Sequence, residues 1–289
     1  MFLFKLLIQL IVLFVDCHAH LFFSPIPTEA IDKDITGEIP IPNLDFIYKM
    51  ISNAKVKGVS HIVGVISNPK DFSSYQKQLE LKNIIRVIGV SRNNYFEDQS
   101  YLISLLEKKI EEKMPHGIGE IGLDYTSGFD QLNDYEINTI KKKQEELFRK
   151  QIEIAKEIDL PIIVHAGYGT DKDIVEILKQ EQAQDVGGQI HGYMSNEELV
   201  SELVDLGFFF SFGYLHTREE ELKRIIEITP LERILTETDS PYHLLEFPKR
   251  FILPEDVVII ADEIAKLKEV NLTDFANLVM KNSRELFKF

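Results

Sequence analysis

Two histidines separated by one residue, His18 and His20, close an apolar run near the start of the chain, in the stretch VDCHAHL. Burying an imidazole is costly unless both of its ring nitrogens find partners. In a strand, residues two apart point to the same side and lie about 7 Å apart. Both side chains could therefore bind one metal ion. A pair of structural histidines is the alternative, and this motif alone does not separate the two.

Four later motifs end predicted strands with further metal-ligating residue types: GEIGLDY with Glu120, IIVHAG with His165, QIHGY with His191 and TETDSPY with Asp239. Each of these residues alone would usually be structural. Together with the histidine pair they supply four imidazoles and two carboxylates, which exceeds what one catalytic ion with an open position needs. The set predicts two divalent ions with Glu120 as a bridging carboxylate. Mixed nitrogen and oxygen ligands suit Zn, Mn, Mg or Fe without selecting among them.

The elements that must position these residues alternate along the chain. Short runs rich in β-branched residues are followed by amphipathic segments, which is the pattern of parallel strands joined by helices. Strands are predicted at 10–16, 60–66, 84–90, 117–121, 161–165, 187–191, 207–212 and 232–237, and helices at 43–57, 69–80, 97–113, 136–158, 171–182, 195–206, 217–228, 255–268 and 273–287.

Eight strand–helix repeats indicate a single-domain α/β fold, a closed (β/α)₈ TIM barrel, and an open doubly wound sheet is the rival. VDCHAH stands after the first strand, where an open sheet usually carries a Gly-rich phosphate loop, and this favours the barrel. In a barrel the carboxyl ends of all strands form one rim, where active sites lie. The predicted ligands would meet there.

The composition restricts the class of partner. The chain has 289 residues, of which 44% are hydrophobic, and this supports a well-buried core in one large domain or two small ones. Its 32 Lys and Arg residues against 47 Asp and Glu residues give a formal charge of -15, which argues against a stable nucleic-acid-binding surface. A polyanionic substrate would have to be attracted locally. Cys17, the single cysteine, excludes an intramolecular disulfide and favours a cytoplasmic protein.

Residues 1–13 form an apolar extension that admits several interpretations. One Lys before a short apolar stretch resembles the start of a signal peptide, but no small-residue cleavage site follows. The stretch is also short for a membrane span of about 20 residues. We interpret its last residues as part of the first strand and the remainder as an extension or a mis-assigned start. Residues 14–289 would then form the barrel domain, with no membrane association.

The motif series, together with QEELFRKQIEIAKEIDLPIIVH, resembles the TatD-like metal-dependent deoxyribonucleases of the amidohydrolase superfamily, and the resemblance covers nearly the whole chain after residue 14. It implies that one ion is held by His18, His20, Glu120 and Asp239, and the other by Glu120, His165 and His191. Asp239 and Glu120 would be the catalytic carboxylates, with Asp239 accepting a proton from the attacking water.

On this basis we expect a metal-dependent hydrolase acting on ester bonds. The leading hypothesis is a deoxyribonuclease or phosphodiesterase whose substrate is DNA or a small phosphodiester. The alternative keeps the same metal core and acts on a small amide, lactone or phosphoester. A metal-dependent binding protein without catalysis is a third class, which the loss of any one ligand would have favoured. All six predicted ligands are present. The oligomeric state is left open.

Three motifs depart from the family pattern around the predicted site. The family commonly has His-Pro after the third strand, where this chain has Ser91-Arg92. It often has Ser-Arg after the histidine of the fifth strand, where this chain has Ala166-Gly167. After His191, an aromatic-Ser-Gly sequence is replaced by residues 193–195, YMS. The predicted metal ligands therefore match the family pattern, whereas the motifs expected to contact the substrate are altered.

Several residues near these motifs are candidates for binding the substrate. Arg92 could contact a phosphate through two of its nitrogens, although a surface arginine is an equally good interpretation. Tyr125 and Tyr193 follow ligand motifs and could line the pocket by stacking, although both could equally be packing residues. Tyr242 is a similar candidate. His216 and His243, after the last two strands, are weaker candidates, and Cys17 is expected to be a small buried hydrophobe.

Overall fold

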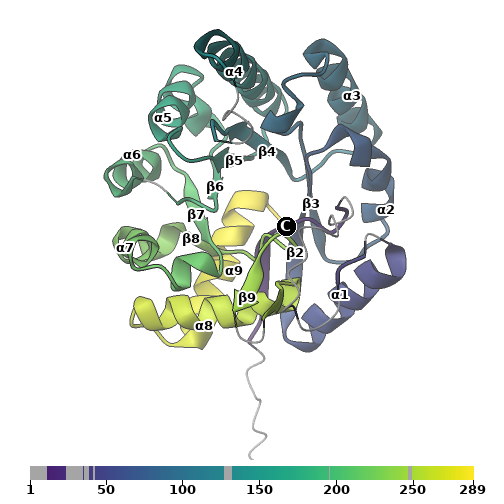
Figure 1. The fold of residues 1–289 in the computed structure, drawn as a ribbon. Helices are drawn as coiled ribbons and strands as arrows, with labels where there is room; N and C mark the ends of the chain where they lie inside the picture. Colours follow the sequence, from purple (N-terminus) through teal and green to yellow (C-terminus); the bar gives the residue numbers. More distant parts are fainter. Residues whose placement is uncertain are drawn as a thin grey trace, which may run out of the picture.

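The structure is a computed structural model that describes residues 12–23, 35, 39–41, 43–126, 132–194, 196–246 and 249–289. Within these residues, eight parallel strands pair in chain order and form a nearly closed barrel, with helices between them as an outer ring (Figure 1). This confirms the predicted TIM barrel. The described residues include no helix that is long and apolar enough to cross a membrane.

The elements have the following bounds. The barrel strands are β1 (Phe14–Ala19), β2 (Val59–Ile66), β3 (Ile84–Ile88), β4 (Gly117–Leu123), β5 (Ile162–Ala166), β6 (Gly188–His191), β7 (Phe209–Phe212) and β8 (Ile234–Thr236). The helices are α1 (Leu44–Val56), α2 (Tyr75–Gln78), α3 (Gln99–Glu112), α4 (Asp134–Glu157), α5 (Asp171–Gln180), α6 (Val200–Asp205), α7 (Glu220–Ile228), α8 (Val257–Leu267) and α9 (Leu272–Phe287). A short hairpin, β9 (Leu244–Glu246) and β10 (Lys249–Phe251), was not predicted.

Side chains along several strands, such as β2, alternate between two apolar clusters. Ile62 and Ile66 of β2 belong to the cluster that contains the buried faces of the outer helices. Val63 and Val65 belong to a second cluster, which therefore lies along the barrel axis. Phe287 of α9 joins the axis cluster close to Gly117, the first residue of β4. The amino end of the barrel is thus filled by apolar side chains, which leaves the carboxyl end for polar ones.

The first strand differs from its prediction. It begins at Phe14 and continues to Ala19, whereas the expected strand was 10–16, of which residues 10 and 11 lie outside the described residues. A register shift between Asp16 and Ala19 inserts an extra residue opposite β2. Such a bulge redirects the side chains that follow it. His18 lies within the strand because β1 continues to Ala19.

The barrel closes where the first and last strands meet. Ala19 forms a parallel bridge with Ser240, and the backbone N–H of His20 donates to the Ser240 carbonyl at 2.8 Å. The N–H of Asp239 donates to the His18 carbonyl at 2.9 Å. Backbone hydrogen bonds across this seam therefore hold two motifs together that are more than two hundred residues apart in sequence.

Two buried glutamines of α4 hold the chain just beyond β3 and β4. Gln151 accepts a hydrogen bond from the backbone N–H of Val90 at 2.6 Å and donates to its carbonyl at 2.9 Å. Gln144 makes the same pair of bonds to Asp124, at 2.9 and 3.0 Å. The two residues lie seven apart and so share one face of the helix. They fix the two loops that carry Arg92 and Asp124.

Gly122 is needed where β4 contacts β5. Its φ is 130°, and a Cβ there would lie 2.2 Å from the carbonyl oxygen of His165. Gly122→Ala is expected to lower the free energy of unfolding by about 3 kcal/mol or more, because backbone strain and a steric clash add. Urea unfolding measures this. Gly169→Ala is the matched control, since Gly169 also has positive φ, 75°, with nothing within 4 Å of its Cβ position. Equal losses for both variants would contradict the steric argument.

Cys17 is buried in the axis cluster, as expected, and its Sγ lies 3.2 Å from Oγ of Ser283 on α9. Burial raises the pKa of this thiol, so the thiolate is not formed near neutral pH. We expect the native protein to react with Ellman's reagent only on unfolding, when one equivalent of thiol should appear. Rapid stoichiometric labelling without denaturant would show that the axis cluster is open.

Candidate metal centre

The six predicted ligands meet at the carboxyl ends of the strands. Their elements are β1, β4, β5 and β6 and the segments that follow β1 and β8, and the residues are His18, Glu120, His165, His191, His20 and Asp239. His18, His20, Glu120 and His191 are buried, whereas His165 and Asp239 are partly exposed.

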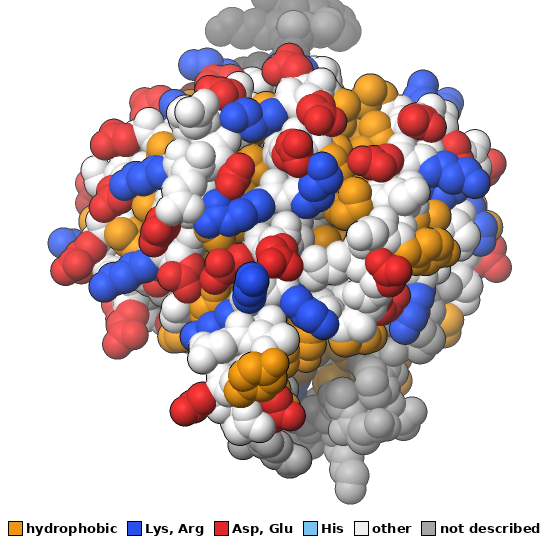
Figure 2. Space-filling model, turned by 90° about the horizontal axis from the view of Figure 1, so that it is seen from above, with side chains coloured by type: hydrophobic (Ala, Val, Ile, Leu, Met, Phe, Trp, Pro, Cys, Tyr) orange, Lys and Arg blue, Asp and Glu red, His pale blue; other side chains and the backbone are white. Residues whose placement is uncertain are grey.

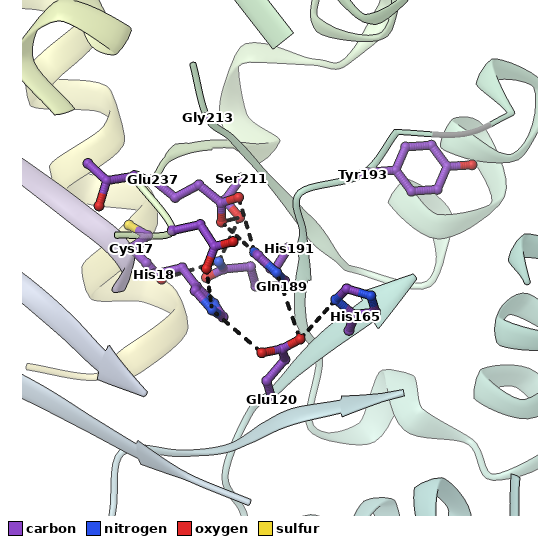
Figure 3. Close-up of polar contacts among 12 residues, drawn as sticks. Cys17, His18, Glu120, His165, Gln189, His191, Tyr193, Ser211, Gly213 and Glu237 are labelled. Atoms are coloured by element: carbon purple, nitrogen blue, oxygen red, sulfur yellow. Dashed lines mark hydrogen bonds and ion pairs between the residues drawn. The ribbon is translucent and has the colours of Figure 1, made fainter. Parts of the chain in front are cut away.

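Glu120 lies between two groups of imidazoles (Figure 3). Its Oε2 lies 3.6 Å from Nε2 of His20 and 3.9 Å from Nε2 of His18. Its Oε1 lies 2.8 Å from Nδ1 of His165 and 3.9 Å from Nε2 of His191. In each group one atom per residue lies within 4.8 Å of the others, a spacing that could hold a metal ion. One carboxylate thus serves two compact sets of nitrogen and oxygen donors.

Asp239 faces the first of these sets. Its Oδ1 lies 3.3 Å from Nε2 of His20 and 3.5 Å from Nε2 of His18, while its Oδ2 lies 3.2 Å from Nε2 of His243. Oδ1 is buried and makes no well-formed hydrogen bond to the described residues. The Nε2 atoms of His18 and His20 are 3.1 Å apart and converge on the same point. Nitrogen lone pairs and an unsatisfied carboxylate oxygen around one point are a donor set that fits a divalent cation.

The ionisation of these groups also suits a cation. Burial tends to raise the pKa of Glu120, but the charge of Arg92 and the contact with His165 hold that pKa well below its usual range. Burial likewise opposes the ionisation of Asp239, yet its close contacts with His20 and His243 keep its pKa well below the ordinary value. Burial lowers the pKa of His18 well below its usual value, and the neighbouring His191 adds to this effect. Near neutral pH the site therefore presents anionic carboxylates and a neutral imidazole, the forms that bind metal.

Glu237 orients His191 and was missed in the sequence. Nδ1 of His191 lies 3.1 Å from its carboxylate, and Ser211 donates a further hydrogen bond to the same group (Figure 3). Gln189 supports Ser211 with a 2.7 Å hydrogen bond. Although burial lowers it, the charge of Glu237 raises the pKa of His191 to about 10. Without a cation, His191 is therefore protonated near neutral pH; its Nδ1–H stays on Glu237, and Nε2, which faces Glu120, would release its proton to bind metal. The only sequence signal was the position of Glu237, two residues before Asp239.

Two further acids near the site were not predicted. Oδ2 of Asp124, which follows β4, lies 3.9 Å from Nε2 of His165 and 3.8 Å from Nη2 of Arg92. Asp16 is fully buried and accepts hydrogen bonds from both the backbone N–H and the hydroxyl of Thr238, at 2.9 and 2.6 Å. Asp16 therefore fixes β1 to the segment that carries Asp239.

Of the predicted substrate contacts, Arg92 is at the site and forms an ion pair with Glu120. The structure does not bring Tyr193 there. Its ring is buried against Phe210, its hydroxyl donates to the Asn196 carbonyl at 2.7 Å, and Figure 3 shows the ring pointing away from the cluster. Tyr125 instead faces α4, with its hydroxyl 3.5 Å from Glu145. Each tyrosine follows a strand, and the chain direction after a strand is not set by strand alternation.

His243 and His216, the two histidines that follow the last two strands, differ in their position relative to the site. His243 contacts Asp239, as described above. His216 is buried and has both nitrogens satisfied, because Nδ1 accepts from the Gly213 N–H at 3.1 Å and Nε2 donates to the Tyr193 carbonyl at 3.0 Å. It is a structural residue.

A cavity of about 460 Å³ opens above the ligands. Its floor includes His20, Glu120 and Asp239, and the rings of Phe96 and Tyr242 lie on its lining with 66% and 53% of their surfaces exposed. The Tyr242 ring packs edge to face with His20 at a centroid distance of 4.9 Å. The tyrosine that reaches the cavity is therefore Tyr242.

Comparisons with known proteins agree with the fold of this chain. The family model described as TatD related DNase matches residues 15–288. The metal-dependent hydrolase YabD of Bacillus subtilis (strain 168) is 32% identical over 281 residues, covering 94% of this chain and 98% of its own. Tatdn3 of Danio rerio, named as a candidate deoxyribonuclease, is 25% identical and covers 95% of this chain and 97% of its own. The crystal structure of YJJV, a TatD homolog from Escherichia coli K12, has a TM-score of 0.79 at 22% identity, covering 96% of this chain and 99% of that one.

Proposed function

Because the chain belongs to the TatD related DNase family and is a metal-dependent hydrolase, we propose that it cleaves phosphodiester bonds in DNA at a centre of two divalent ions. The observation that carries this proposal is the position of Glu120, which is shared by two sets of imidazoles and has Asp239 beside one of them. A carboxylate shared in this way suits paired ions that act on both sides of a phosphodiester.

We assign His18, His20, Glu120 and Asp239 to one ion, and Glu120, His165 and His191 to the other. Zn, Mg and Mn are all compatible with these nitrogen and oxygen donors. When bound, such ions acidify water and neutralise the charge that develops on phosphoryl oxygens.

Asp239 is the group suited to accept the proton of the attacking water. Its low pKa keeps it ionised near neutral pH, and it lines the cavity. As the bond from the water oxygen to phosphorus forms, the bond to the leaving oxygen breaks, the water proton goes to Asp239, and solvent supplies a proton to the leaving oxygen. His243 holds the other oxygen of Asp239 and so fixes the direction of the carboxylate.

The test is the release of mononucleotides from single-stranded DNA by protein loaded separately with Zn, Mn or Mg. Activity should disappear with a chelator and return with at least one of these ions. Protein that carries two ions and cleaves neither DNA nor bis(p-nitrophenyl) phosphate would overturn the proposal. Lactones and small amides would then be the substrates to screen.

We further propose that the protein acts in the cytoplasm. Support comes from the single cysteine, because the chain cannot form the intramolecular disulfides that are common in exported proteins. Fractionation of the native cells with an antibody to the protein tests this, and recovery in a membrane or secreted fraction would contradict it.

A further inference from the structure

One wall of the cavity is built from cationic and amide side chains. Asn68 and Lys70 come from the segment after β2, and Arg92 and Asn93 from the segment after β3. This second segment is held by Gln151 of α4, through the hydrogen bonds to Val90 described above. It is also where the chain departs from the family pattern. Arg92, the residue of this wall beside the metal ligands, is therefore a feature in which this chain differs from the family pattern.

Arg92 has donors directed at more than one partner. Its side chain is 13% exposed, Nη1 pairs with Glu120, and Nη2 lies 3.8 Å from Asp124. Its Nε is buried and donates to no acceptor within the described part of the chain. A guanidinium carries five N–H donors in a fixed fork. Its donor capacity therefore exceeds what these two carboxylates use.

The charges around Arg92 favour an anionic ligand. Glu120 is shared with both candidate cation sets, so a cation bound there would take up the charge that now balances the guanidinium. Lys70 lies on the same wall, and Asp71 is the acid beside it. A planar fork of N–H donors matches a pair of phosphate oxygens better than any other common side chain does.

The surface drawn in Figure 2 carries charges of both signs. On the face drawn there, Lys and Arg side chains are interspersed with Asp and Glu, so that no single-sign field forms over it. With a formal charge of -15, the protein as a whole repels a polyanion. The attraction has to come from groups inside the cavity.

We propose that Arg92, together with Lys70, forms a phosphate subsite that binds the phosphate adjacent to the scissile one. The substrate class follows from this subsite: a nucleic acid strand with at least two successive phosphates, in preference to an isolated phosphodiester. This inference rests on the proposed function. Arg92 is then the residue that determines specificity, and the metal ligands below it determine the chemistry.

The test uses three dinucleotides, TpT, pTpT and TpTp, of which the last two carry one additional phosphate at opposite ends. Each is made with a phosphorothioate in place of the scissile linkage and titrated calorimetrically into the metal-loaded protein. At least one of the phosphorylated probes should bind more than tenfold tighter than TpT. Arg92→Ala should weaken that probe about 10- to 100-fold and change TpT by less than threefold, because only the additional phosphate loses its partner.

Three further variants sharpen the result. Arg92→Lys should retain part of the preference, since it keeps the charge but loses the fork. Lys70→Ala should weaken the same probe about threefold to tenfold, and it tests the subsite even where Arg92→Ala fails to fold. Arg149→Ala is the matched control, because Arg149 forms a comparable 2.6 Å ion pair with Glu181 between α4 and the end of α5.

Equal weakening of TpT and of the phosphorylated probes by Arg92→Ala would show that Arg92 acts through Glu120, and it would overturn the subsite. Equal affinities of the three probes for the wild type would do the same. Cleavage of ordinary TpT separates the two proposals. A wild type that cleaves TpT without preferring an additional phosphate retains the proposed function and loses the subsite. One that prefers the additional phosphate but hydrolyses no phosphodiester retains the subsite and loses the proposed function.

Discussion

Asp239→Asn is expected to reduce kcat for phosphodiester cleavage about 10³-fold or more, because an amide accepts no proton and binds a cation weakly. The fold should survive, since the amide is nearly isosteric and the backbone N–H at this position still bonds to the His18 carbonyl. Rates are to be measured on single-stranded DNA and on bis(p-nitrophenyl) phosphate, with circular dichroism melting as the check on folding.

Asp262→Asn is the matched control for this substitution. Asp262 lies on α8 and forms a half-exposed 2.7 Å ion pair with Lys266, so its loss should change kcat by less than twofold. If Asp239→Asn keeps more than a tenth of the wild-type kcat, Asp239 is not the proton acceptor. The ions alone would then have to account for the rate.

Glu120→Gln is expected to abolish activity by a different route, through loss of metal. Because Glu120 belongs to both candidate ligand sets, one substitution should weaken both sites by more than about 100-fold. Metal content after dialysis should fall from two ions per chain toward none, as measured by plasma mass spectrometry. The cleavage rate should fall with the metal content.

Glu181→Gln provides the comparison, since Glu181 is a half-exposed carboxylate paired with Arg149 outside the site. It should leave two ions bound and the rate unchanged. Two ions retained at wild-type affinity in Glu120→Gln would show that the carboxylate does not bridge. If only the ion held by His165 and His191 is lost, Glu120 is a ligand of that ion alone.

The ligand set could be predicted from the sequence because strand ends can be recognised locally. His165 follows the β-branched run at 162–164, and His191 ends the short predicted strand GGQIH; a parallel fold brings the ends of such strands to one rim. The same argument placed Glu120 and Asp239 there. This prediction did not require the exact register of the strands, because the carboxyl ends of all barrel strands lie at one rim.

Features that depend on the direction of a loop, or on a contact with a residue far away in sequence, could not be predicted from local sequence patterns. Tyr193 and Tyr125 follow strands, but packing against Phe210 and α4 turns both away from the cavity. The bulge in β1 depends on the register with β2, which a single sequence does not encode locally.

By itself, the sequence determined the barrel, the order of its strands and the six residues at its rim, because hydrophobic periodicity and the residue types at strand ends are local properties. Only the tertiary structure decided which atoms of Glu120 face which imidazoles, that Glu237 orients His191, and that Arg92 pairs with Glu120. These are contacts between separate strands and loops. Their distances depend on how the barrel closes and on where α4 holds the loops, and both are set by packing across the whole domain.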